Sequence, residues 1–352
     1  MADRVKIGII GLGMGRAHAE HYRDSPAAQV VALCDQNRER LERVPEHVGG
    51  EVKEARLYTD IAELLADEEV QAVSVALPNA LHAPITIQAL EAGKHVLCEK
   101  PLAMNAAEAE EMVRTARRVG RTLMVHFNVR FNPTSRAVKQ AIDAGALGEI
   151  YYGRTVWHRK RGIPQLGGWF TQKQMSGGGA LIDIGVHRLD LALWLMGYPR
   201  PVSVTGVTYN LLGKRLADSQ EKSFDVDDLA AAFIRFENGA ALTLETSWAS
   251  NTEKREDQWT QLFGVEGGAL IRNHDEGYQF EARLFRSAGE GRKEVTVETP
   301  EPPKPWESAQ THFCRSILTG TEPLAPGEQG LTVMRILDAI YESAATGQEV
   351  RL

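Results

Sequence analysis

The sequence has 352 residues, which is too long for one ordinary core and points to two domains of about 150 residues or more. Hydrophobic residues make up 43% and charged residues 25% of the chain, which excludes a disordered or low-complexity protein. The 40 Lys and Arg against 47 Asp and Glu give a net charge of -7, so we expect no nucleic-acid partner.

Apolar runs such as Leu189 to Met196 are far shorter than the ~20 residues of a membrane span, and the N-terminus lacks a signal-peptide pattern. We therefore expect a cytoplasmic protein without membrane contact. Cys34, Cys98 and Cys314 are odd in number and widely spaced, which favours reduced thiols over disulfides or a zinc site.

The first 126 residues alternate short β-branched runs with helical patterns. Continuously apolar strands separated by helices indicate a parallel sheet with helices on both faces. The sequence therefore predicts an α/β fold with a doubly wound first domain over residues 1–126. Its expected strands are Val5 to Ile10, Gln29 to Cys34, Ala72 to Leu77, His95 to Cys98 and Thr122 to His126.

The pattern changes after residue 126. Two strand-like runs, Asp228 to Phe236 and Ala240 to Trp248, are joined by Glu-Asn-Gly, which is typical of a β-hairpin. We expect residues 127–352 to form an α+β domain on an open, mainly antiparallel sheet, with a final helix that can pack back on the first domain. The proline-rich segment 298–305 predicts a surface connection. The other expected elements are a helix at Thr134 to Ala144, a strand at Glu149 to His158, a strand–turn pattern over Gln258 to Ile271 and Tyr278 to Phe285, and helices at Gln310 to Leu318 and Gly330 to Thr346.

A glycine-rich turn, Gly11-Leu-Gly13-Met14-Gly15, lies between the first strand and the following helix. Glycines there let the main chain approach a pyrophosphate, and the helix N-terminus favours its charge. The spacing is Gly-x-Gly-x-Gly, so Arg16 stands where a small residue normally packs the helix on the strand, and we expect Ala17 to take that role. Such turns also occur without a nucleotide, so the motif alone leaves both interpretations open.

Asp35 ends the second strand twenty residues after Gly15, where a carboxylate would accept the hydroxyls of an adenine ribose. Its charge would repel a 2′-phosphate, which favours NAD over NADP. Arg38 is close enough in sequence to pair with such a phosphate, so NADP stays open.

Polar residues follow three further strands of the first domain, at the edge of the sheet where ligands of open α/β sheets bind. Taken singly, a polar loop residue of this kind is more often structural or solvated than functional. Pro101 restrains its neighbour Lys100, which could donate hydrogen bonds to a substrate hydroxyl or share in a proton relay. We predict cofactor contacts by Pro78, Asn79, His82, Glu99 and Lys100, and substrate contacts by Lys100, Asn128 and Arg130.

Residues 177–197 indicate a glycine turn followed by a helix that is apolar nearly all round and therefore buried. Asp183, His187 and Asp190 are spaced i, i+4 and i+7, on one face. In a buried helix such a stripe must be paired or must border a cavity, so both a structural and a catalytic interpretation are open. A histidine with a nearby carboxylate suits general acid–base chemistry. Because no cluster has the spacing of a zinc site, we expect metal-free catalysis shared by His187 and Lys100.

Four blocks together resemble the Gfo/Idh/MocA oxidoreductase family, named for glucose-fructose oxidoreductase and inositol dehydrogenase. The resemblance implies an NAD(P)-binding Rossmann domain, hydride transfer at a hydroxyl carbon of a sugar or cyclitol, and a homodimer or homotetramer formed through the open sheet. It also implies that His187 exchanges the substrate proton, Asp183 orients His187, and Lys100 stabilises charge on the substrate oxygen. The blocks are residues 11–18, 76–82, 92–101 and 177–190.

The substrate is less defined by the sequence. Trp157, Arg161 and Trp169 precede the buried helix and are predicted to contact the substrate together with Asp183 and His187. An inositol, a pyranose or an anhydro sugar would fit. Two alternatives are an NAD-dependent glycosidase that oxidises the ring transiently and a non-catalytic sugar or dinucleotide sensor.

Overall fold

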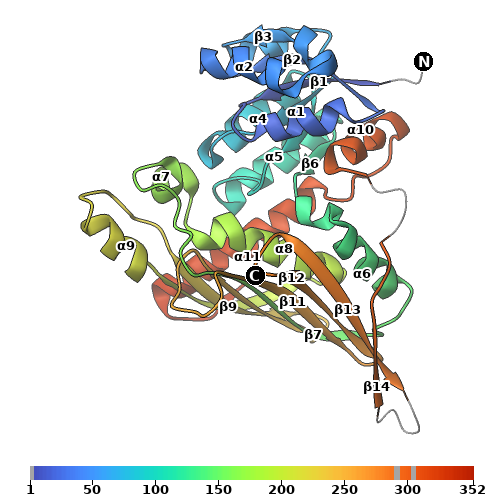
Figure 1. Ribbon diagram of the computed structural model, residues 1–352, viewed down its shortest axis with the longest axis vertical. Coiled ribbons are helices and arrows are strands. Elements are labelled where there is room, and N and C mark those ends of the chain that lie inside the picture. Colours follow the sequence, from blue (N-terminus) through green and yellow to red (C-terminus); the bar gives the residue numbers. More distant parts are fainter. Residues whose placement is uncertain (1–3, 289–293, 303–306) are drawn as a thin grey trace. The chain divides into compact units, whose positions relative to one another are not determined.

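The computed structural model describes residues 4–288, 294–302 and 307–352 (Figure 1). The chain divides into two compact units, and neither is one continuous segment. The first contains residues 1–128 and 307–334, and the second contains residues 129–306 and 335–352. Residues 303–306 of the predicted surface connection lie outside the described residues.

The first unit is built on a six-stranded sheet in the order β3-β2-β1-β4-β5-β6. All of its strand pairs are parallel, and this is the order of the doubly wound dinucleotide-binding fold. All five predicted strands are confirmed, whereas the three-residue β3, which is largely exposed, carries no apolar run that would reveal it. The strands are β1 (Val5–Ile10), β2 (Ala28–Cys34), β3 (Arg56–Tyr58), β4 (Ala72–Val75), β5 (His95–Cys98) and β6 (Leu123–Val125).

Helices separate the strands of this sheet, and polar caps mark where several begin. The side chains of Asn37, Asp60 and Asn105 accept N–H groups in the first turns of α2, α3 and α5. Near the end of the chain, residues 307–334 return to this unit, where the Val125 N–H donates to the Ala325 carbonyl at 2.9 Å. The helices are α1 (Gly15–Arg23), α2 (Arg38–Val48), α3 (Ile61–Ala66), α4 (His82–Glu91), α5 (Ala106–Val119), α10 (Ala309–Thr319) and the beginning of α11 (Gly327–Thr346), with short 3₁₀ turns at η1 (Gly50–Glu54) and η2 (Asn79–Leu81).

The second unit is built on a nine-stranded sheet in the order β14-β13-β12-β11-β7-β10-β9-β8-β15. Among the described strands of this second sheet, only the pair β7 and β10 is parallel, which confirms an open, mainly antiparallel sheet. The strands are β7 (Ile150–Arg159), β8 (Pro201–Tyr209), β9 (Leu229–Phe236), β10 (Ala241–Ser247), β11 (Glu256–Gly264), β12 (Gly267–His274), β13 (Gln279–Ala288), β14 (Glu294–Glu298) and β15 (Val350–Arg351).

The predicted hairpin is present in this sheet. β9 and β10 pair with Leu244 opposite Ala232, and Gly239 in the turn has φ of +84°. Helices α6 and α8 pack on one face of the sheet (Figure 1). β8 and α9 lie between the predicted elements and were not expected. The remaining elements are η3 (Asn128–Phe131), α6 (Pro133–Asp143), η4 (Trp169–Thr171), α7 (Lys173–Ser176), the π-helical turn η5 (Leu181–Gly185), α8 (Val186–Leu195) and α9 (Leu211–Asp218).

The α/β fold class is confirmed by these two sheets. Across the described segments, no helix combines the length and apolar character needed to cross a bilayer. All three cysteines are buried thiols, and burial raises the pKa of each to about 12.

Candidate active site

The glycine turn joins β1 to α1 at the carboxyl edge of the first sheet. Gly11 has φ of +86°, and a Cβ there would lie 2.4 Å from the Ala76 carbonyl oxygen, so glycine is required. Gly15 is the first residue of α1, and a Cβ there would lie 2.8 Å from Cγ2 of Ile9. Gly15 itself therefore provides the close helix–strand packing that we expected from Ala17, and that expectation was wrong.

The middle of the turn is open. Gly13 and Met14 are exposed, and a Cβ on Gly13 would meet no described atom within 4 Å. Met14 occupies the N-cap position of α1, but its side chain makes no capping hydrogen bond. An uncapped helix N-terminus behind an uncovered main chain fits a pyrophosphate, because the N–H groups and the helix dipole favour negative charge.

Asp35 connects the end of β2 to the glycine turn. Its Oδ2 accepts the Leu12 N–H at 2.8 Å, and its Oδ1 accepts the Asn37 N–H at 2.8 Å. Arg38 is exposed, whereas Arg40 places Nη1 3.6 Å from Oδ2 of Asp35. Arg40 is thus the nearer cation, and sequence reasoning missed it because its approach depends on how the first turn of α2 faces the strand end.

His82 links two loops of the carboxyl edge. Its Nδ1 lies 2.7 Å from the Pro101 carbonyl oxygen and its Nε2 lies 2.8 Å from the Leu77 carbonyl oxygen. Burial lowers the pKa of His82, and the two carbonyl oxygens oppose that shift. Both ring nitrogens are used by the main chain, so we no longer count His82 among the candidate cofactor contacts. Asn79 is also buried, and Pro78 precedes it at the start of the same loop.

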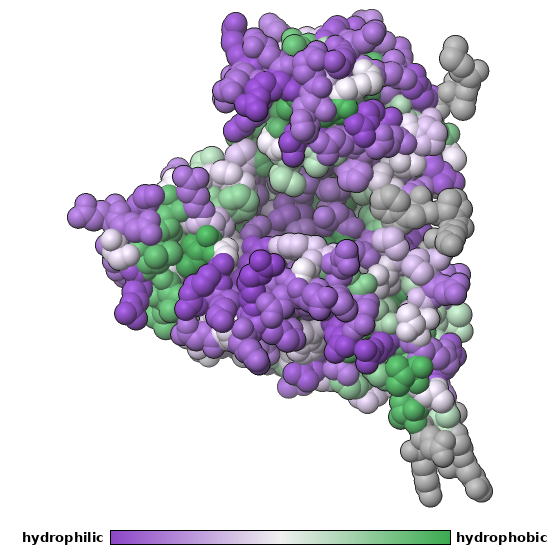
Figure 2. Space-filling model, viewed as in Figure 1, coloured by the Kyte–Doolittle hydropathy of each residue, from purple (hydrophilic) through white to green (hydrophobic). Residues whose placement is uncertain are grey.

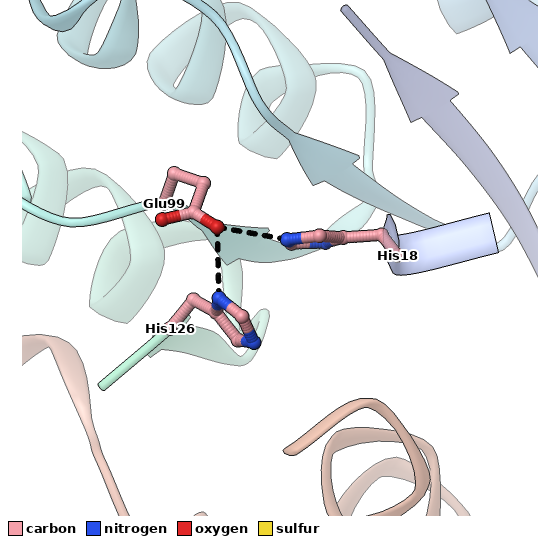
Figure 3. Close-up of side chains that lie close together, drawn as sticks. All are labelled: His18, Glu99 and His126. Carbon is pink, nitrogen blue, oxygen red and sulfur yellow. Dashed lines mark hydrogen bonds and ion pairs between the residues drawn. The ribbon is translucent and has the colours of Figure 1, made fainter. Parts of the chain in front are cut away.

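Glu99 lies at the centre of a buried hydrogen-bond network (Figure 3). Its Oε1 accepts hydrogen bonds from Nε2 of His18 at 2.9 Å and from Nδ1 of His126 at 2.8 Å. Its Oε2 accepts the main-chain N–H of Lys100 at 3.0 Å. Glu99 was predicted as a cofactor contact, but its oxygens are directed at these protein groups. The half-buried Lys100 follows it and forms a cis peptide bond with Pro101.

Sequence reasoning missed His18 and His126 as members of a site. His18 lies one turn after Gly15 on α1, and His126 directly follows β6, so both face the end of β5 only once the sheet is assembled. Together with Glu99 they offer ligand atoms within 4.8 Å of one another, the one such group among the described residues. Each of these atoms already takes part in a hydrogen bond between the three side chains, which accounts for their arrangement.

In the second unit, a glycine turn positions the start of the buried helix. A Cβ on Gly179 would lie 1.7 Å from the Asp227 carbonyl oxygen, and one on Gly178 would lie 2.0 Å from the Tyr341 hydroxyl oxygen. The Asp227 carboxylate accepts the N–H groups of Gly179 and Leu181 at 2.7 and 2.8 Å, and the Tyr341 hydroxyl at 2.8 Å. The buried carboxylate therefore anchors the turn.

Asp183 and His187 are the only residues from 179 to 195 that are not buried. The Trp248 indole N–H donates to Oδ2 of Asp183 at 3.0 Å, and the His187 ring lies 5.8 Å from the Trp157 ring between centroids. Asp183 lies within the π-helical turn η5 and His187 in the first turn of α8. A partly open carboxylate and imidazole on an otherwise buried helix provide the groups for proton transfer.

Asp190, the third member of the predicted stripe, has a structural role. Nε of Arg130 donates to Oδ2 of Asp190 at 2.9 Å and Nη2 donates to Oδ1 at 2.5 Å, with both side chains buried. The Tyr198 hydroxyl also donates to Asp190 at 2.6 Å. The buried ion pair accounts for the charge of Arg130, so we no longer count Arg130 as a candidate substrate contact. Asn128 is exposed at the start of η3.

Aromatic residues surround the Asp183 and His187 segment. Trp157 is buried, its indole N–H donates to Oε1 of Glu256 at 2.7 Å, and its ring is tilted by 44° against that of His187. Trp169 stacks on Phe170 with ring centroids 3.8 Å apart. The exposed Arg161 instead donates to main-chain carbonyl oxygens and to Asn251. Glu256 also accepts from Arg159, Gln258 and Tyr278, and sequence reasoning missed it because its partners come from β7, from β11 and from the turn before β13.

The sheet order, the glycine turn and Asp35 define a dinucleotide-binding protein. Residues 5–127 match the family model for the NAD-binding Rossmann fold of the GFO_IDH_MocA oxidoreductase family, and residues 135–270 match the GFO/IDH/MocA C-terminal domain. The chain belongs to the Gfo/Idh/MocA oxidoreductase family, so the resemblance of its sequence blocks is confirmed. It is an NAD(P)-dependent dehydrogenase with an NAD-binding Rossmann domain.

Three relatives illustrate the breadth of the family. D-glucoside 3-dehydrogenase of Escherichia coli (strain K12) is 32% identical over 99% of this chain and 97% of its own. Myo-inositol 2-dehydrogenase of Thermotoga maritima is 31% identical over 76% of this chain and 75% of its own. A solved structure of levoglucosan dehydrogenase in complex with NADH and levoglucosan has a TM-score of 0.85 at 26% identity, and the match covers 99% of each chain.

Proposed function

We propose that this protein transfers a hydride between a ring carbon of a pyranose sugar or pyranoside and NAD. The observation that carries the proposal is the partial exposure of Asp183 and His187 on a helix segment that is otherwise buried from residue 179 to residue 195. A carboxylate and an imidazole at these positions lower the stability of a buried helix compared with apolar side chains. A purely structural role would not explain why they are there.

Each proposed role follows from an atom of this chain. His187 takes the proton of the substrate hydroxyl when the alcohol is oxidised and returns it in the reverse reaction. Asp183, held by the Trp248 indole N–H, orients the imidazole. Lys100 stabilises the negative charge that develops on the substrate oxygen. Bound NAD⁺ supplies the hydride acceptor, so the carbinol carbon becomes a carbonyl.

Two observations favour a pyranose ring over a cyclitol as the substrate. Trp157 lies beside His187, and Phe170, on which Trp169 stacks, packs against the cluster that contains Trp157 and Ile184. Aromatic faces pack well against the C–H groups of a pyranose. The relatives that align over nearly the whole chain include enzymes named for a glucoside and for levoglucosan, whereas the inositol dehydrogenase aligns over 76% of it.

The experiment that tests this function follows the absorbance of reduced nicotinamide with glucosides, anhydro sugars, free aldoses, sugar acids and inositols. His187→Ala should lower turnover by roughly 10²-fold or more while NAD affinity stays nearly the same, because an acid–base group contributes about that much. His274→Ala, an exposed histidine of the same unit, is the matched control.

Full activity in His187→Ala would remove His187 from the mechanism. Release of product from a chromogenic glycoside, without net reduction of NAD, would replace the dehydrogenase with the glycosidase alternative. Tight NAD binding with neither activity would favour the sensor.

We also propose that Asp35 selects NAD over NADP. Asp35→Asn removes the charge that repels a 2′-phosphate and keeps one oxygen as acceptor for the main chain. We expect the ratio of the dissociation constants for NADP and NAD to fall at least several-fold, measured by titration of each cofactor. In the same background Arg40→Ala should weaken NADP, because Arg40 is the cation nearest to this carboxylate. An unchanged ratio in Asp35→Asn would make Asp35 a structural link to the glycine turn only.

A further inference from the structure

The hydrogen-bond network around Glu99 includes the main chain of the next residue, Lys100. Glu99 is buried, and its two oxygens face different groups (Figure 3). Oε1 accepts from the two imidazoles, and Oε2 accepts from the main-chain N–H of Lys100. The carboxylate thus connects α1 and the end of β6 to the main chain of a proposed catalytic residue.

One assignment of protons satisfies the whole network with both rings neutral. The Tyr22 hydroxyl donates to Oγ of Ser74 at 2.9 Å, and the Ser74 hydroxyl donates to Nδ1 of His18 at 3.1 Å. Nε2 of His18 then carries the hydrogen that the carboxylate accepts. Nε2 of Gln310 donates to Nε2 of His126 at 3.1 Å, which leaves the hydrogen of His126 on Nδ1. Each imidazole is therefore held in the tautomer that donates to the carboxylate.

The burial of His18 supports its neutral form in this assignment. Burial lowers the pKa of His18, and His126 beside it lowers that pKa further. Burial alone would raise the pKa of Glu99, but the imidazoles and their hydrogen bonds more than offset it and hold the pKa well below its usual range. Glu99 is therefore ionised, with three N–H groups donating to it.

We propose that His18 and His126 are positioning residues that hold Glu99 as a carboxylate and thereby fix the main chain of Lys100. Without either imidazole, Glu99 would turn or take up a proton, and Oε2 would no longer hold the Lys100 N–H. A displacement of about 1 Å at a reacting group can cost 10²-fold in rate. The inference rests on the proposed function, because it assumes that Lys100 acts on the substrate.

The chain offers matched variants for the test. Asn places an N–H donor near the position of Nδ1, so His126→Asn should keep the hydrogen bond that His126→Leu loses. Gln reaches the position of Nε2, so His18→Gln should keep the bond that His18→Leu loses. The control is His95→Asn, another histidine of this unit, whose Nδ1 accepts the Thr122 N–H at the other end of β5.

We expect His126→Leu and His18→Leu to lower kcat by 10- to 100-fold with the Kd for NAD unchanged, and the Asn and Gln variants to recover most of it. Loss of the donors should raise the pKa of Glu99, so the acidic limb of the kcat profile should move to higher pH in the Leu variants. Glu99→Gln should lower kcat without moving that limb.

The charged and titratable groups that surround Glu99 and its imidazoles are His18, His21, His82, Cys98, Lys100 and His126.

A readout that needs no substrate is amide hydrogen exchange of the peptide that contains Lys100. The Leu variants should exchange faster at this amide than wild type, and the Asn and Gln variants should match wild type. Unchanged exchange together with unchanged kcat and pH profile in the Leu variants would overturn the proposal. Activity that requires added Zn²⁺ and is abolished by a chelator would also overturn it, because the ring nitrogens would then be metal ligands.

Lys100→Met separates this inference from the proposed function. If Lys100→Met loses activity and the Leu variants do not, the positioning role fails while the function stands. If Lys100→Met is fully active, the role of Lys100 in the proposed function is wrong, and the positioning proposal fails with it.

Discussion

The ion pair between Arg130 and Asp190 shows how a residue that looks catalytic can be structural. Both side chains are buried, two hydrogen bonds join them, and the Tyr198 hydroxyl donates to the same carboxylate. Burial raises the pKa of Asp190, and Arg130 opposes that shift. The pair connects η3 to α8, the helix that carries His187.

Breaking this pair should be more costly than replacing it. Arg130→Met should lower the free energy of unfolding by about 3–5 kcal/mol, because it leaves the Asp190 charge buried without its cation. The double variant Arg130→Met/Asp190→Leu should recover most of that loss, since it removes both charges. Chemical denaturation of the two variants checks the prediction. A double variant as unstable as the single one would show that the hydrogen-bond geometry, rather than the charge balance, is what the fold needs.

For single residues, the sequence was most informative where both the residue type and its spacing along a helix indicated the same role. The spacing of Asp183 and His187 predicts a shared face, and both prove to be the partly open residues of their helix. The same spacing could not reveal that Asp190 is paired, because Arg130 lies 60 residues earlier in the chain. Likewise, nothing local to His18 indicates Glu99, which is 81 residues away.

At the scale of elements, different glycines of the glycine turn are needed for folding and for cofactor binding. Gly11 needs a positive φ and a close approach to Ala76, whereas Gly13 faces open space. Gly11→Ala should therefore lower the melting temperature of the protein without cofactor. Gly13→Ala should leave that temperature nearly unchanged and weaken NAD binding, because its methyl group would occupy the position expected for the pyrophosphate. Differential scanning calorimetry and NAD titration check both variants; equal NAD affinity in Gly13→Ala would place the pyrophosphate elsewhere.

The elements that the sequence revealed are those with a strong local signal. Buried strands of continuous apolar residues and the Asn-Gly hairpin were predicted within a few residues of their bounds. β3 has three residues, mostly exposed, and β15 has two, so neither has a pattern to detect. The π-helical turn at Leu181–Gly185 was predicted as part of the buried helix, because its apolar residues continue the pattern of that helix.

At the scale of the whole molecule, we propose that the second sheet joins copies of the chain. Its residues alternate between a buried face, covered by α6 and α8, and a half-exposed face. On that second face Tyr152 stacks on Phe263, and Arg154 lies over the Trp259 ring. Figure 2 shows further hydrophobic residues near β14, where Val295 and Val297 are exposed. A wide aromatic sheet face of this kind is typical of a protein interface.

The expected assembly is a symmetric dimer or tetramer, measured by light scattering coupled to size-exclusion chromatography. Trp259→Glu should shift the mass toward that of the monomer, because it places a charge in the centre of the proposed interface. Leu211→Glu, at an exposed residue of α9, is the matched control and should leave the mass unchanged. A monomeric wild-type protein at micromolar concentration would contradict the proposal.

The return of residues 307–334 to the first unit also constrains how the chain can fold during synthesis. β6 is an edge strand whose outer side is covered by the Val125 hydrogen bond to Ala325 and the bridge between Met124 and Pro326. While the ribosome has made only the first 128 residues, that edge has no cover and the dinucleotide-binding unit is incomplete. The unit can be completed only after nearly the whole polypeptide has emerged, so a fragment cut at residue 128 should aggregate rather than bind NAD.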